Sequence, residues 1–454
     1  MKIFEVLIIG AGVVGAALAR DLVRHPLSVA LLEAGPEPGE GASKGNSALM
    51  CTGWDTPRGS LEREMVRRGY ERYLNEAPLL GLPIRRTGST MIAWNEEQAE
   101  TLKAEREAAR EDAFAVEWLD RAALYQREPK LGSGALAALF IPGESVVDPF
   151  STVHAYLLEA FVNGAVFLPG RRVVRCARRG NLWEVEAETG ELFRARFVVN
   201  CAGLGGDRVD AAAGFHDFVI KPRKGQFVLF DKLAAPLVNS ILAPTPGPAG
   251  RGVLVVPTIF GNVMLGPTAE EVDDPEDRAV TRAGLDFLLS GGRRLLPDLE
   301  KFPLVTTHAG MRPASDKSEY RFIPRTEQGW ISVGGIRSTG LSSALGLAEH
   351  VTSILAKSLE AGPARDIRRV RVPDLSAGRV PAWEDPSGPE DGEIVCHCEK
   401  ITLGEIRRAL ASPLPPVTLG GLRRRTRAGY GRCQGFFCGA RLAELLREQG
   451  GGKN

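Results

Sequence analysis

Long apolar runs are missing from this sequence of 454 residues. No stretch reaches the roughly 18 apolar residues of a membrane-spanning helix, so we expect no transmembrane span. An excess of one charge is missing too, because 57 lysine and arginine residues face 56 aspartate and glutamate residues. Nucleic-acid-binding proteins usually carry a basic excess, so this balance argues against a nucleic-acid partner. No signal-peptide cleavage site follows the first apolar run, which predicts a cytoplasmic protein and leaves peripheral membrane attachment open.

Cysteine is scarce and unevenly distributed, with seven residues in the chain. Three are scattered through the first 390 residues: Cys51, Cys176 and Cys201. The other four form two close pairs near the C-terminus, Cys396-x-Cys398 and Cys433-x4-Cys438. Cytosolic thiols stay reduced, so these pairs favour metal ligation over disulfides. Zinc sites usually have two to four residues between paired cysteines, and four thiolates can also hold a [2Fe–2S] cluster.

The residues around these two pairs are more specific than their spacing. Residues 394–406 (IVCHCEKITLGEI) and 431–439 (GRCQGFFCG) resemble the bacterioferritin-associated ferredoxin-like [2Fe–2S] domain over residues 393 to 447. The resemblance implies that Cys396, Cys398, Cys433 and Cys438 ligate the cluster and that His397 does not. It also predicts one helix from Thr402 and another after Cys438. A zinc module and a pair of disulfides are the alternatives.

A strand-length apolar run, residues 5–9, leads directly into a glycine turn at the front of the chain. Gly10, Gly12 and Gly15 allow a tight turn, close approach of the backbone to a pyrophosphate, and close packing of helix on strand. The following helix N-terminus favours phosphate. A second strand ends at Glu33, where a carboxylate can hold an adenosine ribose. These residues predict a Rossmann-like dinucleotide-binding unit.

Further glycine turns favour FAD over NAD. A free-standing NAD enzyme would continue with more parallel βαβ units, whereas here a loop of small residues follows at 41–47. Residues 194–203 are typical of a strand ending in a glycine turn, and residues 330–345 of a strand, a glycine turn and a helix. Three widely spaced turns that converge on one cofactor indicate FAD, with the last helix directed at the isoalloxazine.

With these segments, the first ~365 residues resemble the superfamily of FAD-dependent glycerol-3-phosphate dehydrogenases and D-amino-acid oxidases, including its L-2-hydroxyglutarate oxidase relatives. The resemblance implies a discontinuous α/β FAD-binding domain (1–79, 151–214 and 326–371) with an inserted α+β substrate cap (80–150 and 215–325). A linker (372–392) and a small helical [2Fe–2S] domain (393–450) follow. Val173 is expected to contact the adenine through its backbone. The implied FAD contacts are Gly10, Gly12, Gly15, Glu33, Ala34, Ser43, Lys44, Gly45, Asn46, Ser47, Val173, Cys201, Ala202, Gly203, Gly335, Gly340, Leu341 and Ser342.

One position departs from the resembling proteins. They often place a histidine after the glycine loop, facing the flavin, where it serves as the base. This chain reads Asn46-Ser-Ala-Leu-Met-Cys51-Thr-Gly53, with cysteine at that position. A thiol with an ordinary pKa of about 8.5 is a poorer base at pH 7 unless its thiolate is stabilised. Either another group accepts the proton, or the substrate is an amine that loses its own proton to solvent, or Cys51 only packs beside the flavin.

Two arginines are candidate substrate ligands. A guanidinium binds carboxylate or phosphate bidentately and stays charged when buried. The resemblance implies that Arg312 and Arg337 face the substrate; structural ion pairs are the alternative in a chain this rich in arginine. Lys224, on a predicted cap strand, is a further candidate contact, and His308 is a candidate replacement base.

Together these features predict an FAD-dependent dehydrogenase for a small anionic substrate. Glycerol 3-phosphate comes first, then a 2-hydroxy acid, then an amino or imino acid. Hydride would pass to flavin N5, and electrons would leave singly through the cluster to a protein or quinone acceptor. The basic run 423–427 is either a contact for an acidic electron carrier or a solvated helix face. The alternative function is that of a flavin-binding component that works only with a partner chain, and the oligomeric state stays open.

Overall fold

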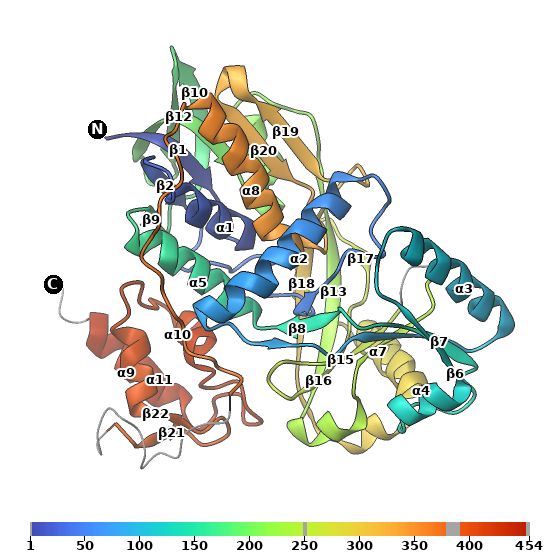
Figure 1. Cartoon of the computed structure of the whole chain (residues 1–454). Helices are drawn as coiled ribbons and strands as arrows, with labels where there is room; N and C mark the ends of the chain where they lie inside the picture. Colours follow the sequence, from blue (N-terminus) through green and yellow to red (C-terminus); the bar gives the residue numbers. More distant parts are fainter. Residues whose placement is uncertain (1, 248–251, 378–390, 451–454) are drawn as a thin grey trace.

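The computed structural model of the chain describes residues 2–247, 252–377 and 391–450. Figure 1 shows two large β-sheets with helices packed around them, and a small helical unit at the C-terminal end of the chain. Most of the predicted linker, residues 378–390, lies outside the described residues.

The first sheet has eight strands and carries the three predicted glycine turns. Its order is β10-β11-β12-β1-β2-β9, with β20 paired to β12 and to β19. β1 runs parallel to β12 and β2, and β12 runs parallel to β20, so the carboxyl ends of these strands meet at one edge. The strands are β1 (Ile3–Ile9), β2 (Val29–Leu32), β9 (Val166–Leu168), β10 (Val173–Arg179), β11 (Leu182–Ala187), β12 (Leu192–Asn200), β19 (Arg321–Arg325) and β20 (Trp330–Gly334).

Both faces of this sheet are buried. Val6 and Ile8 of β1 belong to a core shared with helices, whereas Leu7 and Ile9 belong to a second core on the other face. Such continuous apolar strands are typical of parallel sheets covered on both sides. α1 contacts α5 and α8, and α8 contacts α2. The helices near this sheet are α1 (Val13–Leu22), α2 (Leu61–Leu80), α5 (Pro149–Val162), α6 (Gly206–Ala212) and α8 (Gly340–Ser358).

The second sheet has nine strands and lies in the region predicted as the substrate cap. Its order is β17-β13-β16-β15-β14-β5-β7-β6, with β18 paired to β13. Its strands are β5 (Ser89–Ala93), β6 (Glu117–Asp120), β7 (Ala137–Ile141), β13 (Ile220–Phe230), β14 (Ile241–Pro244), β15 (Leu254–Pro257), β16 (Val263–Gly266), β17 (Glu270–Glu271) and β18 (Leu304–Ser315). Helices α3 (Glu96–Glu111), α4 (Arg121–Arg127) and α7 (Arg282–Leu295) pack around it.

Short elements connect the two sheets. A three-stranded sheet consists of β3 (Leu49–Met50), β8 (Ser145–Val147) and β4 (Ile84–Arg85). The 3-10 helices are η1 (Gly203–Gly205), η2 (Lys232–Leu237), η3 (Pro297–Lys301) and η4 (Thr326–Gln328).

The C-terminal unit has its own apolar core, which includes Ile406, Leu422 and Leu442. Its elements are β21 (Ile394–Cys396), β22 (Ile401–Thr402), α9 (Leu403–Leu410), α10 (Leu419–Thr426) and α11 (Gly439–Gly450). α9 begins at a capping box between Thr402 and Glu405. The predicted helix starts at Thr402 and after Cys438 are therefore confirmed. This unit lies beside α5, with which α10 is in contact (Figure 1).

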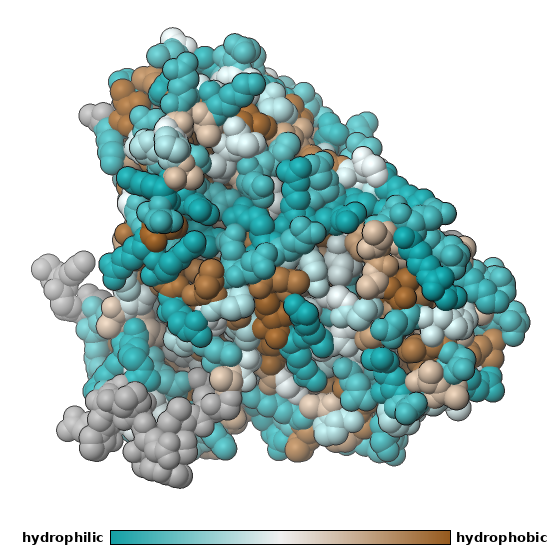
Figure 2. Space-filling model, viewed as in Figure 1, coloured by the Kyte–Doolittle hydropathy of each residue, from teal (hydrophilic) through white to brown (hydrophobic). Residues whose placement is uncertain are grey.

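The sequence predicts these elements well. β5, β13, β15 and β16 lie in predicted strand patches, and α3 covers the helix predicted at residues 96–111. β19 lies in the range predicted for the cap but pairs with β20 of the first sheet. The domain limits otherwise stay predictions, while the predicted α/β class with a Rossmann-like sheet and a second sheet is confirmed. Hydrophilic residues cover most of the face in Figure 2, and apolar residues form small separate patches there.

Candidate active site

The first glycine turn packs directly against the end of β12. Gly10 has φ +104, and a Cβ on it would lie 2.5 Å from the carbonyl oxygen of Cys201. A Cβ on Gly15 would lie 2.0 Å from the carbonyl oxygen of Gly10. Only glycine fits at either position, which gives the tight turn and the close helix–strand packing predicted for a dinucleotide-binding unit. The Cys201 N–H donates to Ile9 O at 2.8 Å, so the β1 and β12 turns lie side by side.

Glu33 connects this turn to the next segment. Its Oε2 accepts from the Ala11 N–H at 2.7 Å and its Oε1 from the Gly35 N–H at 2.8 Å. Burial raises the pKa of this carboxyl, against the effect of the two hydrogen bonds. The Arg171 N–H donates to Glu33 O at 2.7 Å, which brings the start of β10, where Val173 lies, close to Glu33. The predicted adenosine contacts therefore gather at one edge of the sheet, with Ala34 exposed beside them.

The small-residue loop lies between the glycine turn and the second sheet. The Val13 N–H at the start of α1 donates to Ser43 Oγ at 2.9 Å. Asn46 Nδ2 donates to the carbonyls of Ala42 and Ser43, at 3.1 and 2.8 Å. A Cβ on Gly45 would lie 2.7 Å from the Cα of Gly310 in β18. This loop therefore touches both sheets; Lys44 is exposed within it and Ser47 is half-buried.

The third glycine turn meets the residues that follow this loop. The Cys51 N–H donates to Ser342 Oγ at 2.8 Å, which joins the chain after β3 to the first turn of α8. Gly335 has φ +64 after β20, and Gly340 and Leu341 begin α8. Ala202 and Gly203, with φ +55, follow β12. All three predicted turns and Cys51 are thus brought to one edge of the first sheet.

β13 and β18 divide the predicted cap residues between two faces. Their antiparallel register pairs Arg223 with Arg312, Lys224 with Met311, and Phe227 with His308. Side chains of directly paired residues share a face and successive residues alternate. His308, Gly310 and Arg312 therefore share one face, and Gly310 contacts Gly45 of the FAD loop. This face is directed at the predicted FAD segments.

Arg312 is a largely buried cation without a carboxylate partner among the described residues. Its Nη1 donates to the carbonyls of Arg223 and Lys224, at 3.4 Å each, and its Nη2 to Thr268 O at 3.2 Å. Burial, together with the charge of Arg223, lowers the pKa of Arg312 to about 10. A buried guanidinium held only by long bonds to carbonyls is suited to receive a carboxylate or a phosphate.

Arg337 lies near Arg312 but is differently satisfied. Its backbone N–H donates to Pro313 O at 3.4 Å, and it adopts φ +51. Its guanidinium pairs with the buried carboxylate of Glu62 from α2, which also accepts from Thr339 Oγ1 at 2.7 Å. The structure therefore brings the two predicted substrate arginines together, and a carboxylate that sequence reasoning missed balances one of them.

Lys224 lies on the opposite face of β13 from Arg312. Its Nζ pairs with Asp277 Oδ2 at 2.7 Å. Gln226, two residues further along the same face, packs against Gly284 of α7. Because Lys224 faces α7 and not the FAD loop, we do not include it in the proposed substrate site.

His308 shares a face with Arg312 but stands four residues away along β18, roughly 13 Å at ~3.3 Å per residue. Its ring stacks on Phe227 with 4.8 Å between centroids and 9° between planes. Burial lowers the pKa of His308 to about 4. The imidazole is therefore neutral at pH 7, and Cys51 is nearer than His308 to the turn that carries Arg337.

The four C-terminal cysteines lie in two neighbouring pairs. The thiol of Cys398 hydrogen-bonds that of Cys433, and the thiol of Cys396 hydrogen-bonds that of Cys438. Backbone N–H groups of Phe437, Gly435 and Phe436 favour the Cys433 thiolate and hold its pKa below the ordinary value. No group of three or more His, Cys, Asp or Glu side chains in the described part of the chain surrounds a single point as for one metal ion. Four thiols in two pairs fit a two-iron cluster.

The basic run 423–427 is used within the chain. Arg425 pairs with Glu37 at 2.9 Å, Arg424 with Glu40 at 3.0 Å, and Arg427 with Glu399 at 3.2 Å. Both interpretations of this run from sequence, a contact for an acidic carrier and a solvated helix face, are therefore wrong. It attaches the C-terminal unit to the loop that follows Glu33.

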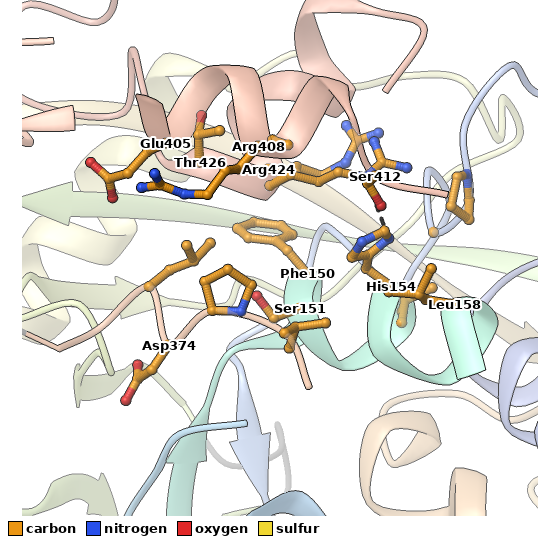
Figure 3. A pocket seen from close by; sticks show the side chains of 18 of the residues that line it. Phe150, Ser151, His154, Leu158, Asp374, Glu405, Arg408, Ser412, Arg424 and Thr426 are labelled. Carbon is orange, nitrogen blue, oxygen red and sulfur yellow. Dashed lines mark hydrogen bonds between the residues drawn. The ribbon is translucent and has the colours of Figure 1, made fainter. Parts of the chain in front are cut away.

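A cavity of about 680 Å³ lies beside this attachment, away from Arg312. Figure 3 shows Phe150 and His154 of α5 on one side of it and Arg424 and Thr426 of α10 on the other. Ser43 of the FAD loop also lines it. The contact between the C-terminal unit and the rest of the chain is therefore formed around a hollow.

Comparison with known proteins agrees with this geometry. Residues 5–354 match the family described as FAD dependent oxidoreductase, and residues 394–448 match the family described as BFD-like [2Fe–2S] binding domain. The chain therefore belongs to the FAD dependent oxidoreductase family and carries a [2Fe–2S] domain at its C-terminal end. The predictions of FAD and of a [2Fe–2S] cluster are confirmed, and both groups fit the glycine contacts and thiols described above.

The relatives within this family are more specific. A glycerol 3-phosphate dehydrogenase from Caloramator mitchellensis is 30% identical, covering 98% of this chain and 94% of its own length. One component of the anaerobic glycerol-3-phosphate dehydrogenase from Escherichia coli (strain K12), named as a subunit, is 26% identical, covering 98% and 88%. A glycerol 3-phosphate oxidase from Mycoplasma pneumoniae is 28% identical, covering 80% and 97%.

The fold has counterparts among solved structures. The L-alpha-glycerophosphate oxidase from Mycoplasma pneumoniae with FAD bound aligns with a TM-score of 0.77 and 24% identity, covering 82% of this chain and all of that one. No helix within the described residues is long and apolar enough to cross a membrane.

Proposed function

We propose that this chain is a dehydrogenase for glycerol 3-phosphate or a closely similar small anion. The observation that carries the proposal is Arg312, a buried guanidinium on the face of β18 that meets the FAD loop, with no carboxylate partner among the described residues. A substrate phosphate would supply the missing negative charge and gain charge-assisted hydrogen bonds. The glycerol 3-phosphate enzymes among the relatives support this substrate class.

The chain's own residues then hold and orient the substrate. Arg312 and Arg337 approach from neighbouring segments, and Cys51, held through its N–H by Ser342, lies at the same edge of the sheet. We infer that Cys51 accepts the hydroxyl proton of the substrate when the neighbouring C–H hydrogen leaves as hydride. FAD supplies the hydride acceptor when it is bound.

Electrons leave one at a time through the C-terminal cluster in this proposal. A fused one-electron centre suits a dehydrogenase better than an oxidase that gives its electrons directly to oxygen. The lengths of the relatives agree: the two named dehydrogenases cover 98% of this chain, and the named oxidase covers 80%. The final acceptor would be a protein or a quinone, and one relative is named as part of a larger enzyme.

An anaerobic visible spectrum of the purified protein, recorded before and after glycerol 3-phosphate, tests the proposal. We expect the flavin band near ~450 nm to bleach, followed by a change in the iron–sulfur absorption. Bleaching by amino or imino acids alone would replace the substrate assignment, and Cys51 in place of a histidine is the observation that favours this second candidate. A flavin that none of these compounds bleaches would support a flavoprotein component that needs a partner chain.

A further inference from the structure

The loop that follows Glu33 carries two sets of contacts. One set is directed at the FAD turn: Glu33 accepts from the Ala11 N–H at 2.7 Å, and the Gly39 N–H donates to Ala11 O at 3.0 Å. Ser43 accepts from the Val13 N–H at 2.9 Å at the start of α1. The position of this loop therefore decides how the dinucleotide-binding turn is closed.

The second set belongs to Glu37, whose side chain turns away from the FAD turn toward the C-terminal domain. Glu37 is 1% exposed. Its Oε1 accepts from the N–H groups of Val417 and Thr418 at 2.6 and 3.0 Å, and its Oε2 accepts from Arg425 at 2.9 Å. All of these partners lie about 380 residues further along the chain.

The fit around Glu37 is close. A Cβ on Gly421 would lie 2.0 Å from Glu37 Oε1, so any larger residue at 421 would displace this carboxylate. Glu37 also sits at the N-terminal end of α10, where a negative charge is stabilised by the helix dipole. Removing one partner of such a buried pair leaves an uncompensated charge, which a domain contact rarely tolerates.

α10 in turn leads to the cluster cysteines. It ends at Thr426, and the Gly429 N–H donates to Cys396 Sγ at 3.4 Å. A single eight-residue helix therefore connects the carboxylate in the FAD loop with the thiols at the other end of the same domain.

We propose that Glu37 is a positioning residue that couples FAD retention to docking of the [2Fe–2S] domain. The docked domain holds the loop of residues 34–43 against the glycine turn, and bound FAD holds the same loop for the domain. Such coupling is reciprocal, because each ligand or contact must change the other's free energy by the same amount. The inference rests on FAD binding alone and is independent of the proposed substrate.

The test uses the full chain in its FAD-loaded and FAD-depleted forms, and it needs no turnover. For Glu37→Gln we expect the dissociation constant for FAD, measured by flavin fluorescence, to rise at least about tenfold. Arg425→Met, a change confined to the C-terminal domain, should weaken FAD similarly. Glu128→Gln is the matched control, because Glu128 is also 1% exposed and accepts backbone N–H groups, but only within the cap.

Hydrogen–deuterium exchange reports the reverse direction. In the unaltered chain, adding FAD to the depleted protein should slow amide exchange across residues 414–426. This protection should be absent in Glu37→Gln and present in Glu128→Gln. Unchanged FAD affinity in both Glu37→Gln and Arg425→Met, or equal FAD protection of residues 414–426 in Glu37→Gln and the unaltered chain, would overturn the proposal. Failure of the substrate assignment would leave both measurements unaffected.

Discussion

The buried carboxylate of Glu62 pairs with Arg337, and no described carboxylate does the same for Arg312, although the two arginines lie on adjoining segments. The pair is therefore asymmetric. Arg337 has its charge balanced before substrate arrives, whereas Arg312 brings an uncompensated positive charge to the substrate face. The substrate anion should gain most from Arg312.

This asymmetry predicts the ranking of two substitutions. Arg312→Met should raise the KM for glycerol 3-phosphate at least about tenfold, because one charge-assisted hydrogen bond contributes about 1.5–3 kcal/mol. Arg337→Met should have the smaller effect, since Glu62 already balances this charge. Steady-state reduction of an artificial electron acceptor gives both values, with Arg293→Met in the cap as a control for an exposed ion pair. The reverse ranking would show that Arg337 is the main anion contact.

The pKa of Arg312 predicts a pH dependence. Burial lowers this pKa from 12.5 to about 10, so the cation is present at neutral pH and is lost as pH rises through that value. The KM for an anionic substrate should be constant from pH 7 to 9 and rise about tenfold per pH unit above about pH 10. A neutral analogue such as glycerol should show no such rise. A KM for the anion that stays flat to pH 11 would argue against Arg312 as its partner.

Cys51 allows a test of the proton acceptor. Cys51→Ser should slow anaerobic flavin reduction at least about 100-fold, because a serine hydroxyl is not ionised at these pH values and general-base catalysis contributes about 10²–10⁴. Cys51→His should restore or exceed the original rate at pH 7. The measurement is stopped-flow bleaching of the flavin with saturating substrate. A serine variant that keeps half the rate would mean that the proton leaves by another route.

Removing a cluster ligand should separate the two halves of the reaction. In Cys433→Ser we expect the iron–sulfur absorption to be lost while substrate still bleaches the flavin. Transfer to a one-electron acceptor should then fall at least about tenfold relative to flavin bleaching. Iron analysis and the same anaerobic spectra check this, with Cys176→Ser in β10 as the control. An unchanged rate of acceptor reduction would show that the cluster is not on the electron route.

The contact between Gly45 and Gly310 gives a prediction about FAD affinity. A Cβ on Gly310 would lie 1.8 Å from the carbonyl oxygen of Gly45, so Gly310→Ala should push the FAD loop away from the cap. Overpacking of this kind costs about 1–3 kcal/mol, and we expect FAD to be lost more readily on dilution. Gly41→Ala in the same loop is the control, because no atom lies within 4 Å of its Cβ position. Equal FAD retention in the two variants would contradict the prediction.

The sequence predicts what is local. Gly10, Gly15 and Glu33 lie within one βαβ unit, and their roles follow from turn geometry that short-range sequence determines. The helix starts at Thr402 and after Cys438 depend on residues immediately beside them. Motifs of this kind carry their own structural context, so they can be interpreted without knowledge of the fold.

What depends on distant pairing is missed. Lys224 and Arg312 both lie on cap strands, and only the β13–β18 register shows that they face opposite sides of the sheet. Glu62 lies 275 residues from Arg337, so nothing in the sequence indicates that it balances that charge. The basic run 423–427 is misread for the same reason, because the carboxylates that neutralise it come from the N-terminal part of the chain and from Glu399, beside Cys398.

The close approach of Gly421 to Glu37 has an evolutionary consequence. Because a Cβ at position 421 would lie 2.0 Å from the carboxylate oxygen, the two positions cannot change independently. Homologous sequences with alanine or serine at position 421 should carry a shorter residue at position 37, and those that lack the C-terminal domain should be unconstrained at position 37. Covariation between these two distant positions would then record when the two redox modules became one enzyme.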